Sequence, residues 1–276
     1  MNVPATLAVA RNTFKESARN RILYAIVGAT ILVCGLSYVL AAVSTGDDVT
    51  SVPRRLRIIA NTSLSAIALL GALCAIFLGT NLVYQEVERK TVYTILARPI
   101  GRGEFIVGKF LGLASVVVVA VALMAAGFAA FFALYGGAGA LGWKHALAIA
   151  FTAVELVVVV AIALVFSSTA NPIEGAIFAF VVTLMGHATG NLNDLGKDLV
   201  TPRANHAPGM VEHATEKLLH VIYVVLPNLE NFNFRAQAVN DLPIDPLLPV
   251  TALGYGALYS ALLLAVAIFF FGRKTL

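Results

Sequence analysis

The chain has 276 residues, of which 59% are hydrophobic and 12% are charged, and its formal net charge is +4 at pH 7. A soluble globular chain carries about twice that fraction of charged residues. The composition therefore excludes a soluble domain and indicates a polytopic membrane protein. The two cysteines, Cys34 and Cys74, both lie in apolar runs, which excludes a disulfide framework.

Residues 1–21 predict an amphipathic helix on the membrane surface. Val9, Phe14 and Ala18 lie on its apolar side. The other side carries basic residues whose long side chains can reach lipid headgroups, namely Arg11, Lys15 and Arg19. The apolar run that follows is too long for the core of a signal peptide, so we expect it to stay in the protein as a span.

Six apolar stretches are long enough to cross a bilayer, which takes about 20 residues for a core about 30 Å thick. They are residues 22–43, 58–83, 110–135, 146–166, 173–190 and 248–271. The fifth has the least secure boundaries, because Glu174 lies near its start and His187 near its end. We therefore predict an all-α membrane protein with six transmembrane helices in one domain, residues 1–276.

Lysine and arginine predict the orientation of these spans. They are more frequent in residues 1–21, 84–109 and 272–276 than in the short connections on the other side. The positive-inside rule therefore places these three segments, and both termini, in the cytoplasm. The basic residues of 54–57, which this orientation places on the outer side, are a local exception to the positive-inside rule.

The connections expected on the outer side differ in size. The first, residues 44–57, is short and polar, and the next is rich in glycine. The last, residues 191–247, is long and contains a helix-like piece that ends at Pro227. Its apolar residues recur at helical spacing: Val211, Ala214, Leu218, Ile222 and Val225.

The inner segment 84–109 is strongly charged and patterned as a helix up to residue 98. Glu86 and Lys90 form an i,i+4 pair of favourable polarity. Pro99 disfavours helix at the residue before it, so the helix should stop there. Glu104 then begins the next helix, where its charge suits the helix dipole. A plain orientation-holding loop needs no such pattern, so we interpret the segment as a docking surface.

Gly103, Gly108 and Lys109 match a phosphate-binding loop, G-x-x-x-x-G-K, except for its last letter. Phe110 stands where a serine or threonine would bind magnesium, and no strand precedes the glycines. We interpret the match as accidental. The residues between the glycines are then the first turn of the third span, and Lys109 is an anchor at the inner membrane face.

The run "GTNLVYQEVERKTVYTILARPIGRGEFIVGKFLG" resembles the signature region of type-2 ABC transporter permeases, in which E-x-E-x-x-T leads into L-x-x-P-[IV]-x-R and then GK. The matching residues are Glu86, Glu88, Thr91, Leu96, Pro99, Ile100, Arg102, Gly108 and Lys109. The N-terminal "ARNTFKESARNRIL" is similar to the connecting helix of this family, and "LPNLENFNF" resembles its segment before the last span.

The resemblance implies a permease subunit of the inner membrane, in a complex of two permeases, alike or related, with two ATPase subunits. Most members of the family export. ATP and Mg²⁺ would bind to the ATPase, so we expect this chain to be no enzyme and to hold no cofactor. Besides the protein subunits, we expect it to contact membrane lipid and no nucleic acid. The residues expected to rest on the ATPase are Glu86, Glu88, Arg89, Lys90, Thr91, Arg98, Pro99 and Arg102.

The short connection "FSSTANPIEG" reads either as a second, smaller ATPase contact or as a plain tight turn. The residues concerned are Ser168, Asn171 and Pro172. The small residues Gly71, Ala75 and Gly79 allow close helix packing, either within one protomer or across a dimer.

Glu155 lies in the fourth span, where a carboxylate costs on the order of 3 kcal/mol unless it is paired or neutral. It marks either a translocation path or a hydrogen bond between helices, and the same choice applies to His187 and Asn191 near the end of the fifth span. His213, Glu216 and His220 share a helical face, but this spacing arises easily in polar helices, and we expect no metal.

Two other function classes would require motifs or charges that this sequence lacks. An intramembrane enzyme, either a protease or a lipid-modifying transferase, would show a serine loop with a histidine on another span, or H-E-x-x-H; the sequence has neither. An ion-coupled carrier would need more charge within the membrane than Glu155 alone.

Overall fold

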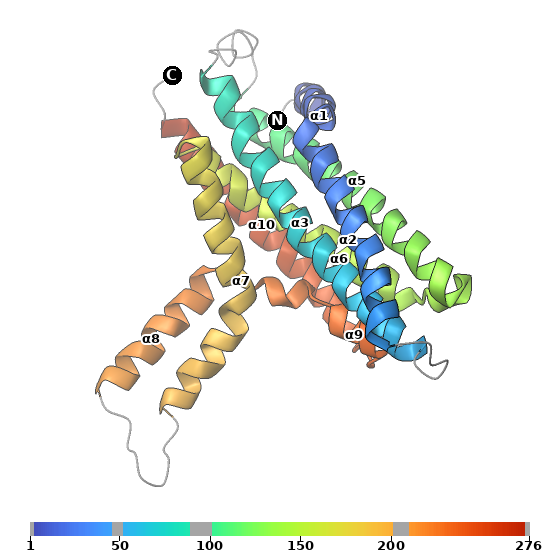
Figure 1. Ribbon diagram of the computed structural model, residues 1–276. Helices are drawn as coiled ribbons and strands as arrows, with labels where there is room; N and C mark the ends of the chain where they lie inside the picture. Colours follow the sequence, from blue (N-terminus) through green and yellow to red (C-terminus); the bar gives the residue numbers. More distant parts are fainter. Residues whose placement is uncertain (1–2, 46–51, 89–100, 201–209, 274–276) are drawn as a thin grey trace. The chain divides into compact units, whose positions relative to one another are not determined.

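The computed structural model describes residues 3–45, 52–88, 101–200 and 210–273 (Figure 1). Within these ranges the chain is helical and contains no strand. It forms two compact units. Unit 1 comprises Met1–Ala179 and Phe232–Leu276, and unit 2 comprises Phe180–Asn231.

The predicted all-α architecture with six spans is confirmed: six of the described helices are long and apolar enough to cross a membrane. They are α2 (Arg21–Thr45), α3 (Val52–Glu88), α5 (Arg102–Gly136), α6 (Trp143–Ser167), α7 (Pro172–Val200) and α10 (Leu247–Arg273). The remaining elements are α1 (Val3–Ala18), η2 (Ala138–Ala140), α8 (Met210–Val225), η3 (Leu229–Phe232) and α9 (Arg235–Asn240).

Several helices extend beyond the apolar stretches that predicted them. α3 begins at Val52, so Arg54, Arg55 and Arg57 lie in its first turns and not in a loop. α5 begins at Arg102 and therefore includes Lys109. Hydropathy locates the part of a helix that crosses the hydrocarbon core, whereas caps and glycine turns determine where the helix ends.

The centre of unit 1 is the close contact between α3 and α6. A Cβ atom on Gly79 would lie 2.6 Å from Ala163 Cβ, and one on Gly71 would lie 2.5 Å from Leu156 Cδ1. The small-residue repeat of the second span thus packs inside one protomer, which answers the question that the sequence left open. At one end of this pair the Ser167 hydroxyl donates to the carbonyl of Thr80 (3.0 Å).

Unit 2 contains the second part of α7 together with α8 and the turn that follows it. The helix predicted before Pro227 is confirmed as α8. A Cβ atom on Gly186 would lie 2.8 Å from the carbonyl oxygen of Pro227, so α7 and this turn are in direct contact.

Candidate functional site

The segment expected to contact an ATPase joins α3 to α5, and only part of it is described. Glu86 and Glu88 belong to the last turns of α3, but their side chains fall outside the description. Five of the expected residues lie outside the described residues altogether: Arg89, Lys90, Thr91, Arg98 and Pro99. Arg102 and the start of α5 are described, and they define the geometry of the site.

The first turn of α5 is capped and attached to the end of α10. The backbone N–H of Gly101 donates to Glu104 Oε2 (3.2 Å), so the role expected for Glu104 at the helix start is confirmed. Arg102 Nη1 donates to the carbonyl of Gly272 (2.6 Å). The rings of Phe105 and Phe271 stack with their centroids 5.6 Å apart. These contacts hold the beginning of α5 and the C-terminal turn of α10 together.

α1 lies directly against α5 (Figure 1), because two glycines remove the side chains that would separate them. A Cβ atom on Gly108 would lie 2.8 Å from Val9 Cβ and 2.9 Å from the carbonyl oxygen of Thr6. A Cβ atom on Gly112 would lie 2.6 Å from the carbonyl oxygen of Ala10 and from Thr13 Cβ. Glycines four residues apart are a known device for close helix approach in membranes.

The buried side of α1 differs from the apolar side that the sequence suggested. Its fully buried residues are small and mostly polar: Thr6, Ala10, Thr13 and Ser17. Val9, Phe14 and Ala18 are only partly buried, and the basic residues Arg11, Lys15 and Arg19 are exposed. The helix itself is confirmed, but its packing face was missed because threonine and serine give no apolar signal. The spacing of small residues was the signal that could have found it.

Lys109 is not a lipid anchor, and that prediction is wrong. Its side chain is 1% exposed, and its Nζ lies 3.9 Å from Glu16 Oε2 of α1. The same Nζ is 5.7 Å from the ring centroid of Phe105, one turn earlier on α5. Because α1 packs against Gly108 and Gly112, the lysine between them is enclosed by protein. A buried ammonium is stabilised by a nearby carboxylate and aromatic ring, so these contacts offset part of the cost of enclosing it.

The structure of residues 103–109 shows that the match to a phosphate-binding loop lies within a helix. These residues form the first two turns of α5, as predicted, and follow Gly101, whose backbone is extended. The backbone N–H groups of a helix beyond its first turn bond within the helix and cannot cradle a phosphate.

The second connection lies between α6 and α7. Ser168 is 1% exposed and its hydroxyl donates to the carbonyl of Val165 (2.6 Å), whereas Asn171 is exposed. Pro172 begins α7, and the carbonyl of Asn171 accepts a hydrogen bond from the N–H of Gly175 (2.7 Å). Since Ser167 donates to Thr80 near the end of α3, this turn belongs to the same end of unit 1 as the α3–α5 segment.

The other candidate residues are distributed over both units. Glu155 in α6 is 3% exposed inside unit 1. His187 and Asn191 are in the unit 2 part of α7, where His187 Nδ1 is 3.0 Å from the carbonyl oxygen of Thr183. His213 Nδ1 and Glu216 Oε2 of α8 are 4.0 Å apart. Among the described residues, no group of three histidine, cysteine or acidic residues is placed to hold a metal.

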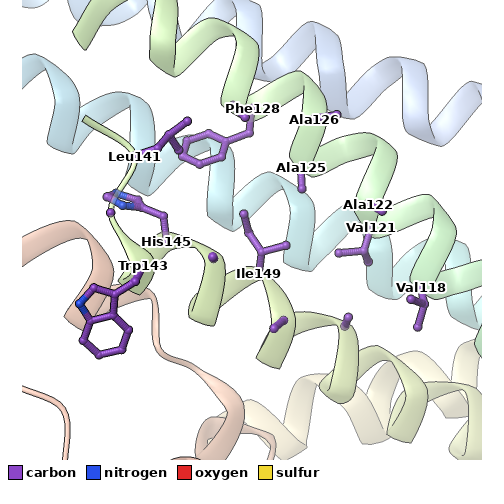
Figure 2. A pocket seen from close by; sticks show the side chains of 15 residues that line it. Val118, Val121, Ala122, Ala125, Ala126, Phe128, Leu141, Trp143, His145 and Ile149 are labelled. Atoms are coloured by element: carbon purple, nitrogen blue, oxygen red, sulfur yellow. The ribbon is translucent and has the colours of Figure 1, made fainter. Parts of the chain in front are cut away.

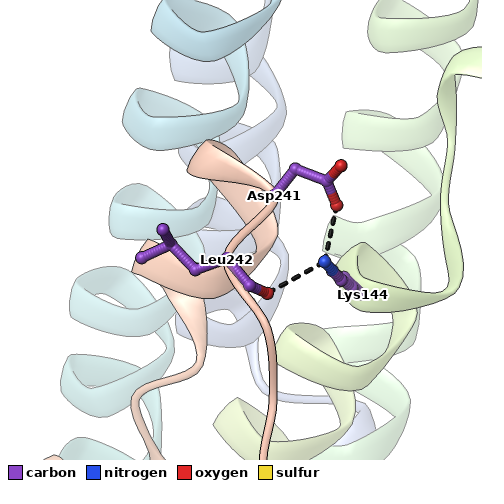
Figure 3. Close-up of polar contacts among 3 residues, drawn as sticks. All are labelled: Lys144, Asp241 and Leu242. Atoms are coloured by element: carbon purple, nitrogen blue, oxygen red, sulfur yellow. Dashed lines mark hydrogen bonds and ion pairs between the residues drawn. The ribbon is translucent and has the colours of Figure 1, made fainter.

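The opposite end of unit 1 carries a charged contact that the sequence did not suggest. Lys144 Nζ, in the first turn of α6, donates to Asp241 Oδ1 (2.6 Å) and to the carbonyl of Leu242 (2.9 Å), as Figure 3 shows. The hydrogen bond and charge of Lys144 lower the pKa of the Asp241 carboxyl below its ordinary value of 3.8. This contact ties the start of α6 to the residues that follow α9.

Six apolar helices, with an N-terminal helix packed on the third of them, are the architecture of a multi-span membrane protein. The chain belongs to the ABC-2 family of transporter proteins, whose family model matches residues 7–276. It is thus a permease subunit of the ABC transporter type.

Two curated relatives carry the same printed name, probable ABC transporter permease protein NosY. The one from Pseudomonas aeruginosa is 33% identical over 112 residues, which cover 40% of this chain and 39% of the relative. The one from Stutzerimonas stutzeri is 32% identical over 115 residues, which cover 41% of this chain and 40% of the relative. The chain thus spans about two fifths of the length of the curated relatives it matches.

Proposed function

We propose that this chain is the permease subunit of an ATP-driven exporter of the inner membrane, with both termini in the cytoplasm. The segment 84–109 docks on a separate ATPase subunit, and the turn at Asn171 makes a second contact with it. Two permease copies and two ATPase copies form the working complex. The ATPase holds ATP and Mg²⁺, so this chain needs no cofactor of its own.

The observation that carries this proposal is the way in which α1, α5 and α10 are joined beside the docking segment. Glycine contacts attach α1 to α5, and Arg102 with Phe105 attaches α10 to it. A partner that displaces the segment before Gly101 would therefore move three helices together. A loop that served only to hold orientation would have no use for such a junction.

Docking is tested by reversing one charge. We expect Glu88→Arg to reduce co-purification of a co-expressed ABC ATPase subunit, because the docking surface would lose an acidic group. The control is Glu216→Arg, which makes the same change on α8 outside the docking segment. Equal recovery of the ATPase with both variants and the unmodified chain would refute the docking role.

Orientation and path are tested separately. A cysteine at position 89 should react with a membrane-impermeant maleimide only from the cytoplasmic side, and reaction from outside would overturn the topology. As path residues we propose Glu155, buried in α6 of unit 1, and, as separate candidates within unit 2, His187 and Asn191 of α7. Glu155→Gln should change transport or its pH dependence in proteoliposomes, and unaltered transport at every pH would remove it from the path.

A further inference from the structure

Two cavities adjoin at the end of unit 1 where α5 ends and α6 begins. The larger has a volume of about 660 Å³ and lies between α5 and α6, with almost wholly apolar walls (Figure 2). The smaller has a volume of about 350 Å³ and is lined by charged as well as apolar residues. Gly142, Trp143 and His145 form walls of both, so the two spaces meet at these residues.

The larger cavity has the dimensions of a groove for one acyl chain. Its lining extends from Val118 to Ala129 on α5 and from Trp143 to Ala153 on α6. At a rise of 1.5 Å per residue each wall is about 15 Å long, which is half of a hydrocarbon core about 30 Å thick. Exposed alanines line it and leave it open at the side: Ala122, Ala126 and Ala150.

The smaller cavity supplies positive charge at one end of this groove. Arg57 of α3 is exposed in its wall and makes no hydrogen bond or ion pair with any residue of the described ranges. Lys144, also in the wall, uses two of its three N–H groups on Asp241 and Leu242. Since Asp241 balances Lys144, Arg57 gives the cavity an excess positive charge among the residues that the structure describes.

The junction of the cavities has the character of a membrane–water interface. Trp143 is 65% exposed at the first position of α6, and tryptophan is enriched at the depth of the lipid headgroups. Figure 2 shows His145 between the Trp143 and Phe128 side chains. Its ring centroid is 5.1 Å from that of Phe132, which also lines the smaller cavity. The apolar groove thus leads to the positively charged smaller cavity at the depth of the lipid headgroups.

We propose that these two cavities bind one anionic phospholipid. One acyl chain occupies the groove between α5 and α6, and the phosphate lies against Arg57 and the remaining N–H of Lys144. A zwitterionic lipid fits the groove equally well, but it adds a cation next to Arg57. The site is formed by unit 1 alone and shares no residue with the docking segment at the other end of the spans.

The test uses the full chain in nanodiscs that contain a phosphatidylglycerol with a photoreactive group on its acyl chain. We expect the cross-links, mapped by mass spectrometry, to concentrate on residues 118–129 and 143–153. Unlabelled phosphatidylglycerol should compete for labelling, and phosphatidylcholine should not. Equal competition by the two lipids would show bulk lipid contact only and would overturn the proposal.

Arg57→Gln tests the headgroup contact, with Arg54→Gln as its matched control. Arg54 is exposed on the same turns of α3 but does not line the cavity. A basic residue near the membrane surface contributes enough to change binding of an anionic lipid about fivefold. Arg57→Gln should therefore lower the labelling about fivefold at low salt, while Arg54→Gln leaves it unchanged. Equal effects of the two variants would refute a specific phosphate contact.

Ala126→Phe tests the groove, with Ala130→Phe as its control. Both are exposed alanines of α5, but only Ala126 lines the groove. Ala126→Phe should abolish labelling at residues 143–153, and Ala130→Phe should not. If Ala126→Cys instead forms a disulfide between two copies of the chain and the groove takes no label, a second copy covers it and the proposal fails.

Discussion

Replacing Gly112 by alanine places a methyl group where α1 crosses α5. Its carbon would lie 2.6 Å from the carbonyl oxygen of Ala10 and from Thr13 Cβ, about 0.8 Å short of the 3.4 Å at which ordinary contact begins. Neither atom is the end of a flexible side chain, so α1 must move as a whole. Overpacking of this kind costs about 1–3 kcal/mol.

The preference of alanine over glycine within a helix, about 1 kcal/mol, does not offset this cost, because α5 is helical whether or not α1 is attached. We therefore expect the contact of α1 with α5 to weaken by about 1–3 kcal/mol. These values correspond to an increase of about 5- to 150-fold in the fraction of molecules with α1 detached. Gly28→Ala in α2 is the control, since a Cβ atom there would meet nothing within 4 Å.

Detachment is measured with Ser17→Cys, a nearly isosteric change on the buried face of α1. Ser17 is fully buried, and the native cysteines Cys34 and Cys74 are buried as well. The rate of maleimide labelling at position 17 should rise by the factor above with Gly112→Ala and remain unchanged with Gly28→Ala. If Gly112→Ala leaves the rate unchanged, α1 does not pack on α5 through this glycine.

Three further predictions concern stability in detergent. Gly79→Ala should lower the free energy of unfolding by about 1–3 kcal/mol, because Ala163 Cβ cannot move aside. Gly71→Ala should lower it by less than about 1 kcal/mol, because the Leu156 methyl group can rotate away. A lower melting temperature for Gly71→Ala than for Gly79→Ala would contradict this. Ser167→Ala should cost about 1 kcal/mol, since the buried Thr80 carbonyl loses a donor, and no change in melting temperature would show that the bond is dispensable. Because Lys144 lowers the pKa of Asp241, the stability that their contact provides should be present above about pH 4 and be lost as the pH falls through that lowered pKa. Asp241→Asn should not show this loss of stability when unfolding is measured against pH.

Hydropathy was sufficient to predict the six spans, although not where each helix ends. Each span is an apolar run long enough for a bilayer, and Glu104 was placed correctly because acidic residues suit helix starts. The contact of α1 with α5 was not predicted, because its surface consists of glycine on one side and of Thr6, Thr13 and Ser17 on the other. A search for apolar faces selects Val9 and Phe14 instead, and Lys109 then looks like a surface residue.

The lipid site could not be predicted from any local pattern. Its smaller, charged cavity is lined by the first turns of α3, the start of α6 and residues at the end of α9, which are far apart in the sequence. In the sequence Arg57 was only an exception to the charge rule for orientation. Its role depends on which of its neighbours carry compensating charge, and only the tertiary structure determines that.

The close contact of α3 with α6 joins these two helices into one rigid pair. α3 has 37 residues and is about 55 Å long, with the docking segment at one end and Arg57 near the other. Because Gly79 and Ser167 leave no space for α3 to slide past α6, a tilt of α3 would carry α6 with it and would move Arg57 and Lys144 as well. Under the proposed function, a lipid bound by both residues would resist that movement, so membrane composition would affect how readily the spans tilt.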